Sequence, residues 1–172
     1  MVSAEVAEDS RRHGGLAELY ERHAPAAGRL AYLLTGSHEQ AEDLVQEAFV
    51  RVVGRFGHLR MPDAFPAYLR TTIVNLHTSG LRRRRLERAY LEREAGRRVQ
   101  TASPPDVGNR QALWAALQRL PARQRAVVVL RYYEDLSEAE TAHAMRCSVA
   151  AVKSMTARAM QTLRERVGSD ER

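Results

Sequence analysis

Two helices separated by a very short turn are predicted between Leu136 and Arg166, and this pair constrains the fold more than any other feature. Ser137, followed three residues later by Glu140, forms a capping box in which each side chain satisfies a backbone N–H of the first helical turn. The helix that it opens has a short apolar stripe, formed by Ala139, Ala142 and Met145. This helix ends at Arg146-Cys147, and Ser148 then offers a second N-cap.

The helix that follows Ser148 has two chemically different sides. One side carries an apolar stripe, and the other is small, polar and basic; the stripe contains Val152, Thr156, Ala159 and Leu163, and the opposite side contains Lys153, Ser154, Ala157, Arg158 and Gln161. A short helix, a tight turn and a helix with such a face are typical of a helix-turn-helix, whose second helix fits the DNA major groove. An ordinary helical hairpin with a solvated face is the alternative reading of this stretch.

The overall charge favours a polyanionic partner. The 172 residues carry a formal net charge of +6, and the isoelectric point is near 10.1, which favours nucleic acid over a membrane surface. The single cysteine, Cys147, excludes an intramolecular disulfide and is interpreted as a small packing residue. No long apolar run indicates a signal peptide or a membrane span, so we expect a cytoplasmic chain that does not contact the membrane.

The first half of the chain also reads as helical. Residues 1–15 are polar and aperiodic, which predicts a flexible arm. Apolar residues at helical spacing come next, and Pro25 is expected to bend or divide this helix. These apolar residues are Leu16, Leu19, Tyr20, Ala27, Leu30, Ala31 and Leu34. Ser37 with Gln40 predicts a second capping box, after which one stripe is apolar: Ala41, Leu44, Val45, Ala48, Phe49, Val52, Val53 and Phe56. Another face of this helix carries Asp43, Gln46, Glu47 and Val50.

A third helix follows the loop at 57–62 and runs into a block of arginines. Its apolar positions are Phe65, Tyr68, Leu69, Thr72, Ile73 and Leu76, with Asn75 near its end. The block Arg82, Arg83, Arg84 and Arg85 is either a solvated helix end or a phosphate site, and the mutual repulsion of adjacent cations favours the phosphate site.

A linker rich in proline and glycine divides the chain. Beyond it, Ala112, Leu113, Ala116, Leu117 and Leu120 predict a helix that stops at Pro121, and another helix is expected from Ala122 to Tyr133. We therefore predict an all-α protein with an arm at 1–15, a domain at 16–95, a flexible linker at 96–108 and a second domain at 109–167.

We find no site for catalytic chemistry or a cofactor. There is no glycine-rich phosphate loop, and the histidines are too scattered to form a metal cluster. Asp43 and Glu47 could pair as catalytic carboxylates, but the sequence supplies neither a pocket nor further ligands for them.

Three stretches closely resemble the extracytoplasmic-function sigma factors of bacterial RNA polymerase, in the sigma-70 family. They are AEDLVQEAFVRV at 41–52, AYLRTTIVNL at 67–76 followed by LRRRR, and LPARQRAVVVLRYYEDLSEAETAHAM followed by SVAAVKSMTARAMQTLR. The first two look like the family's conserved region 2 and the last like region 4. The stretch LAYLLTGSHEQAEDLVQEAF is similar to an actinobacterial subgroup.

The resemblance implies roles for the first domain. The face of Asp43, Gln46, Glu47 and Val50 would dock on the clamp helices of the polymerase's largest subunit. A base flipped out of the promoter's minus-10 element would be held by the loop and by Asn75, and the arginine block would hold nearby phosphates. The loop residues are Gly57, His58, Leu59, Arg60 and Met61.

The second domain would read the minus-35 element as duplex and contact the flap of the second-largest subunit. Its DNA-facing residues would be Ser148, Lys153, Ser154, Ala157 and Arg158, with Arg131 approaching the backbone. The flexible linker would let two weak DNA contacts act together. An anti-sigma protein is a further candidate partner.

The chain departs from the family pattern in three ways. Ala150-Ala151 replaces a usual Gly-Thr, and Met155 and Met160 stand where arginine is common, which predicts a weaker grip on DNA. Tyr68 replaces a usual tryptophan within the aromatic core.

Two other classes of protein remain as alternatives. A free-standing helix-turn-helix regulator that binds operator DNA as a dimer accounts for Ser137 to Arg166 equally well, but leaves the Asp43 face and Asn75 unexplained. A helical adaptor that binds only protein leaves the arginine block and Lys153 without a role.

Overall fold

The structure, a computed structural model, describes residues 2–56, 62–95 and 108–167, with side chains for 17–55, 63–80 and 111–166. Within these residues the chain is helical and has no strand, as the sequence predicts. The elements are α1 (Val2–Thr35), α2 (His38–Phe56), the 3-10 turn η1 (Pro62–Ala64), α3 (Phe65–Ala95), α4 (Gly108–Arg119), α5 (Ala122–Val128), the π-helical η2 (Val129–Tyr133), α6 (Glu138–Ala144) and α7 (Val149–Val167).

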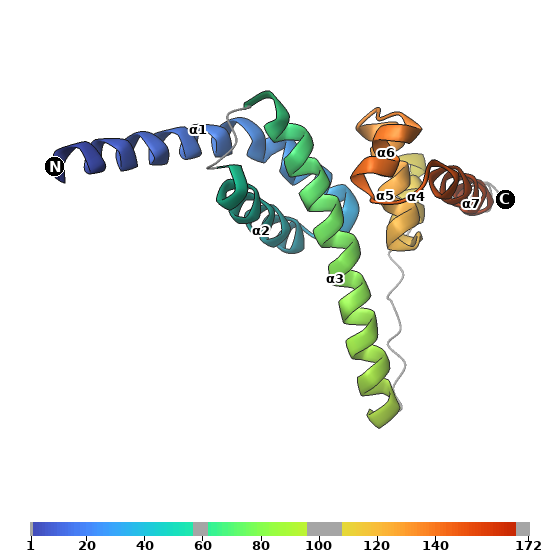
Figure 1. The fold of residues 1–172 in the computed structure, drawn as a ribbon. Coiled ribbons are helices and arrows are strands. Elements are labelled where there is room, and N and C mark those ends of the chain that lie inside the picture. Colours follow the sequence, from blue (N-terminus) through green and yellow to red (C-terminus); the bar gives the residue numbers. More distant parts are fainter. Residues whose placement is uncertain (1, 57–61, 96–107, 168–172) are drawn as a thin grey trace.

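The first domain is a three-helix unit in which α2 and α3 pack on the C-terminal half of α1 (Figure 1). The predicted stripes form its interior, because residues at helical spacing share one face. The buried members are Ala27, Leu30, Ala31, Leu34, Ala41, Val45, Ala48, Phe49, Val52, Phe65, Leu69 and Ile73. Phe65 contacts the ring of Phe49, with 5.7 Å between ring centroids, and this contact joins α3 to α2.

Three details of the first domain differ from the predictions. α1 runs without a break through Pro25 and extends back to Val2, so residues 2–15, expected as a flexible arm, continue the helix. At the start of α2 only half of the predicted capping box forms: the Gln40 N–H donates to Ser37 Oγ over 3.4 Å, whereas the Ser37 N–H donates to Thr35 Oγ1. A preceding threonine hydroxyl thus takes the role expected for Gln40.

The second domain contains the predicted helix pair. Ser137 and Glu140 form the complete capping box at the start of α6, with distances of 2.8 and 3.2 Å. Ser148 caps α7, because its Oγ accepts from the Ala151 N–H over 3.1 Å. Between the two helices Arg146 adopts a positive φ of 50°, which turns the chain. Cys147 is half-buried and packs against the core, as predicted.

The helix predicted from Ala122 to Tyr133 widens before it ends. After α5 the backbone becomes π-helical in η2, and the Glu134 N–H donates to the Val129 carbonyl over 3.0 Å. π-turns of this kind frequently occur at functional positions. Here the widening ends at Glu134, whose side chain reaches the first domain.

The two domains pack directly against each other. A single apolar cluster contains Leu34 and Phe65 of the first domain together with Leu130 and Val152 of the second. A smaller cluster joins α4 to α7 through Ala116, Leu120, Ala159 and Leu163. The sequence predicts two domains joined by a linker, but it gives no sign of the interface between them. Residues 96–107 of the predicted linker lie outside the described residues.

Candidate nucleic-acid interface

The recognition-helix face predicted on α7 is exposed. Lys153, Ser154, Ala157 and Arg158 all point to solvent, while Val152 and Ala159 on the opposite side are fully buried. The apolar stripe of α7 packs on α4, α5 and α6. The side of the helix that remains in solvent is therefore small and basic. A small, basic helix face is the kind of surface that can enter a DNA major groove.

One acidic side chain restrains the basic face of α7. Glu138, in the first turn of α6, lies 3.5 Å from the Nζ of Lys153, and both side chains are substantially exposed. An exposed pair of this kind contributes little to stability. It places a carboxylate of α6 beside the ammonium group of Lys153 on α7.

Met155 and Met160 do not lie on the exposed face of α7. Met155 packs against the main cluster and Met160 against the smaller one, and both are half-buried. Their side chains therefore contribute to packing, which explains why apolar residues are tolerated there. Both methionines therefore lie away from the exposed face of α7, which is the face for which weaker DNA binding was predicted.

Arg131 is placed differently from the recognition helix. It is half-buried, and its Nη1 donates to the carbonyl oxygen of Leu136. This bond ties its guanidinium to the turn that precedes α6. A contact between Arg131 and the DNA backbone stays a prediction.

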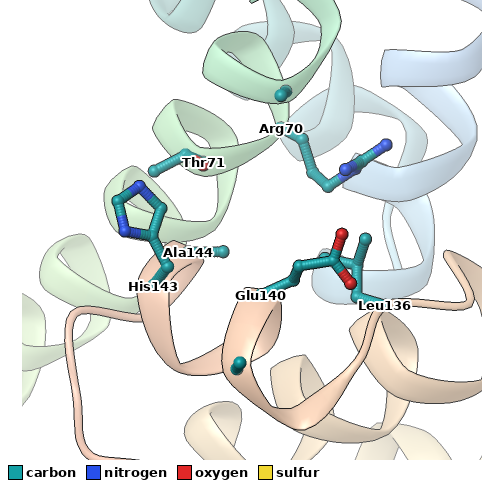
Figure 2. Close-up of a pocket in the computed structure, with 8 residues that line it drawn as sticks. Arg70, Thr71, Leu136, Glu140, His143 and Ala144 are labelled. Atoms are coloured by element: carbon teal, nitrogen blue, oxygen red, sulfur yellow. The ribbon is translucent and has the colours of Figure 1, made fainter.

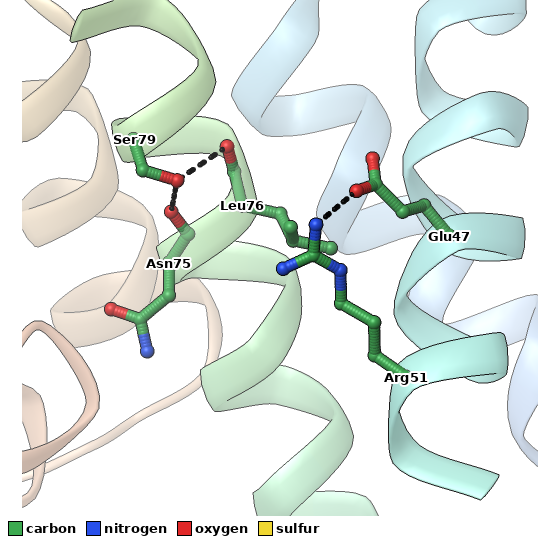
Figure 3. Close-up of polar contacts among 5 residues, drawn as sticks. All are labelled: Glu47, Arg51, Asn75, Leu76 and Ser79. Atoms are coloured by element: carbon green, nitrogen blue, oxygen red, sulfur yellow. Dashed lines mark hydrogen bonds and ion pairs between the residues drawn. The ribbon is translucent and has the colours of Figure 1, made fainter. Parts of the chain in front are cut away.

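The minus-10 set is described only in part. Asn75 is half-buried on α3, and its amide points away from Arg51 and Glu47 of α2 (Figure 3). The hydroxyl of Ser79 donates to the backbone carbonyl of Asn75 over 2.6 Å, so this contact does not involve the side-chain amide of Asn75. The arginines of the block lie on the helical backbone of α3, and their side chains are outside the described residues, as are all atoms of the loop Gly57, His58, Leu59, Arg60 and Met61.

The face predicted to bind polymerase lies on the solvent side of α2. Asp43, Gln46, Glu47 and Val50 all point to solvent, and Val50 is 74 % exposed. Glu47 also pairs with Arg51 one turn away, with 2.6 Å between Oε1 and Nη2 (Figure 3). The surface is thus acidic with one apolar residue on it.

Tyr68 makes a polar contact between two helices. Its hydroxyl accepts a hydrogen bond from the Nη1 of Arg55 over 3.0 Å, which joins α3 to the end of α2. This bond raises the pKa of Arg55. A tryptophan could not accept such a bond, because its indole N–H only donates.

Each of the two domains matches a known protein family. Residues 19–87 match sigma-70 region 2, and residues 110–163 match sigma-70 region 4. Two curated relatives are an RNA polymerase sigma-E factor of Streptomyces avermitilis, 35 % identical over 91 % of this chain and 89 % of that protein, and one of Streptomyces antibioticus, 38 % identical over 73 % and 69 %. The chain belongs to the sigma-70 family.

Further relatives place it within the extracytoplasmic-function group. The ECF RNA polymerase sigma factor SigE of Mycolicibacterium smegmatis is 35 % identical over 86 % of this chain and 60 % of its own length. Among solved structures, the sigma factor RpoE of Bartonella quintana, crystallised with the anti-sigma factor NepR, superposes with a TM-score of 0.68 at 26 % identity, over 90 % of this chain and 97 % of that one. The relatives in Streptomyces and Mycolicibacterium agree with the predicted actinobacterial subgroup.

The family makes this chain an RNA polymerase sigma factor, which acts in transcription initiation. A free-standing regulator is not favoured, because region 2 covers the domain that such a regulator leaves unexplained. In the residues that the structure describes, no three metal-binding side chains come together, and no helix is long and apolar enough to cross a membrane.

Proposed function

We propose that this sigma factor docks on core RNA polymerase through the exposed acidic face of α2 and reads promoter DNA through Asn75 and the exposed face of α7. The observation that carries the proposal is the exposure of both faces on one chain. Asp43, Glu47 and Val50 have no role in the packing of α2, and Lys153 and Arg158 have none in the packing of α7.

The charge of each face indicates the kind of partner that it would bind. A carboxylate face on a chain with a net charge of +6 suits a basic protein surface, such as the clamp helices of the polymerase's largest subunit. The basic face of α7 suits duplex DNA at the minus-35 element, with the flap of the second-largest subunit holding that domain in place. Asn75 and the loop before α3 would accept a base flipped from the minus-10 element, which costs a few kcal/mol of stacking. The protein would do this work in the cytoplasm, as a factor without catalytic activity of its own.

A pull-down with core polymerase in the absence of DNA tests the docking face. Asp43→Arg combined with Glu47→Arg should abolish the binding of core polymerase, because both side chains are exposed and their loss leaves the helix intact. Glu18→Arg combined with Glu21→Arg is the matched control, since it makes the same charge change on the exposed surface of α1. Equal core binding by the two double variants would refute the docking face.

An anti-sigma protein is proposed as a second partner. The support is the superposition of both domains on an RpoE chain that was solved with its anti-sigma factor. Such a protein should compete with core polymerase for this chain in a pull-down. An anti-sigma candidate that binds together with polymerase, without displacing it, would contradict this role.

A further inference from the structure

The two cations on the exposed face of α7 have different surroundings. The Nζ of Lys153 lies 3.5 Å from the Oε2 of Glu138, and the two side chains are 64 % and 40 % exposed. Arg158, on the same face, makes no ion pair with any residue whose side chain the structure describes. A carboxylate therefore partly neutralises Lys153, whereas Arg158 keeps its full charge toward solvent.

The start of α6 does not require Glu138. The capping box is complete with Ser137 and Glu140 alone. A carboxylate in the first turn suits the helix dipole, but Glu140 already supplies one. An ion pair between exposed side chains also contributes little to stability. Folding of the second domain therefore leaves the contact between Glu138 and Lys153 unexplained.

Two neighbouring acidic side chains are directed at the first domain instead. Glu134, which follows η2, pairs with Arg70 of α3, with 2.6 Å between Oε2 and Nε. Glu140 lines a cavity of about 350 Å³ between α3 and α6, together with Arg70 and Thr71 (Figure 2). Of these three carboxylates, only that of Glu138 contacts the basic face of α7.

A DNA duplex bound to α7 would meet Glu138 as well. In a helix-turn-helix the second helix enters the major groove, and the first helix crosses the sugar-phosphate backbone. Here α6 is the first helix, and Glu138 contacts a lysine on the exposed face of the second, so its carboxylate lies at the edge of that face. A carboxylate at this edge attracts the ammonium group of Lys153 and repels DNA phosphates.

We propose that Glu138 is a positioning residue that restrains Lys153 and thereby weakens the contact of α7 with DNA phosphates. The ammonium group has to leave the carboxylate, or share it, before it binds a phosphate, and this cost is the same for every DNA sequence. Base-edge contacts by Arg158 set the sequence preference separately. The inference rests on the proposed function, because it assumes that DNA binds the exposed face of α7.

Such a restraint suits a chain with excess positive charge. With a net charge of +6, the protein is attracted to the phosphates of any duplex, and sites of the wrong sequence greatly outnumber promoters. A weaker phosphate contact on α7 shortens the time that the chain spends on those sites. Glu138 therefore lowers the affinity for DNA in general and leaves discrimination to the base contacts.

Binding of the full chain to a mixed-sequence duplex tests the restraint. Fluorescence anisotropy at about 0.1 M salt should show Glu138→Gln binding roughly two- to fivefold more tightly than the parent chain. The slope of log K against log salt should also steepen by up to about 1, because Lys153 is then free to displace a counterion. A purely structural role of Glu138 would not steepen this slope, and unchanged affinity and slope would overturn the inference.

The effect has to act through Lys153. In a Lys153→Gln background, Glu138→Gln should therefore change the affinity by less than about 1.5-fold, because the group that it releases is absent. An undiminished effect in that background would show that Glu138 repels DNA by itself, which would overturn its role as a positioning residue.

Glu165→Gln is the matched control. It makes the same charge change on an exposed position of α7, where Glu165 accepts a hydrogen bond from Gln161 over 3.0 Å. Position 165 lies roughly 18 Å from Lys153 along the helix axis, at 1.5 Å per residue. That distance exceeds the Debye length of about 10 Å at 0.1 M salt. The affinity of Glu165→Gln should therefore stay within about 1.5-fold of the parent value.

Sequence preference distinguishes the restraint from base reading by Glu138 itself. The polymerase-bound protein is titrated with a promoter duplex, chosen by run-off transcription, and with the same duplex carrying a scrambled minus-35 element. Glu138→Gln should raise the affinity for both duplexes by the same factor. A change in the ratio of the two affinities would make Glu138 a base-reading residue and would overturn the inference.

The inference and the proposed function fail in different ways. If Lys153→Gln and Arg158→Ala weaken DNA binding but Glu138→Gln does not strengthen it, only the inference is overturned. If Lys153→Gln and Arg158→Ala both leave the affinity for every duplex unchanged, the proposed DNA-binding face of α7 is wrong, and the inference fails with it.

Discussion

Trp114 stacks on Tyr32 with an interplanar angle of 16°, and His38 stacks on the same tyrosine with 4.2 Å between centroids. Rings from α1, α2 and α4 thus meet at Tyr32, where the two domains are in contact. The only tryptophan of the chain is half-buried at this interface, so its fluorescence reports on the packing of the two domains here.

Removal of the middle ring should open this part of the interface. We expect Tyr32→Ala to cost about 1–2 kcal/mol of unfolding free energy, because it removes a stacked aromatic pair and its buried area. The emission of Trp114 should shift to longer wavelength and become easier to quench with acrylamide. Tyr20→Ala is the control, since Tyr20 contacts Phe49 within the first domain. If both variants gave the same Trp114 emission, the stack on Tyr32 would have no role in the packing of Trp114.

Gly36→Ala should destabilise the chain, whereas Gly54→Ala should not. At position 36 an alanine meets both a left-handed backbone and the Gln118 side chain, which predicts a loss of about 1–2 kcal/mol. At position 54, inside α2, no atom lies within 4 Å of the new Cβ, and we expect a gain of about 0.5–1 kcal/mol. Chemical denaturation measures both changes.

Adding Gln118→Ala separates the two costs at position 36. This second change removes the clash but leaves the backbone strain, so the double variant should lose less than the sum of the two single variants. Simple additivity would show that the close approach of Gln118 contributes nothing.

Arg158→Ala and Lys153→Ala should weaken DNA binding in different ways. If Arg158 contacts a base edge, its loss should cost about 1–3 kcal/mol and relax sequence preference at one position of the minus-35 element. If Lys153 contacts a phosphate, its loss should weaken binding to all sequences and reduce the slope of log K against log salt by about 1. Titration of polymerase-bound protein with duplexes at several salt concentrations distinguishes these outcomes. Identical effects of both variants on every duplex would assign both side chains to the backbone.

His23 should make stability depend on pH. Burial, and to a lesser extent the charge of Arg22, lower its pKa from the ordinary value of 6.5. The unfolded chain therefore binds a proton more readily than the folded one. This contribution to stability is full above pH 6.5, and it falls as the pH decreases from there toward the folded pKa.

His23→Gln should weaken the dependence of the unfolding free energy on pH below 6.5. Chemical denaturation at a series of pH values measures this change. The lowered pKa of Glu140, caused by its bonds to Ser137, acts only below 4.5 and so does not overlap. A profile that keeps the same slope below pH 6.5 in His23→Gln would assign the effect to another group.

The elements that the sequence predicted are those that depend on neighbours along the chain. Capping at Ser137 and Ser148 involves residues three positions apart, and the stripe of α2 from Ala41 to Val52 follows helical periodicity. Errors arose where a distant partner decides the outcome. Leu113 was assigned to an apolar stripe, yet it is 50 % exposed, whereas Trp114 beside it is at the interface with Tyr32.

The sequence by itself therefore determined the all-helical class, the two domains, and the exposed faces of α2 and α7, because periodicity and capping are local properties of the chain. Only the tertiary structure decided how the domains meet. Arg70 and Glu134 are 64 residues apart, and Arg125 and Leu34 are 91 apart, with no local pattern that marks them as partners. Such contacts form when packing brings two helix ends and a buried cation together, and only the folded chain specifies that geometry.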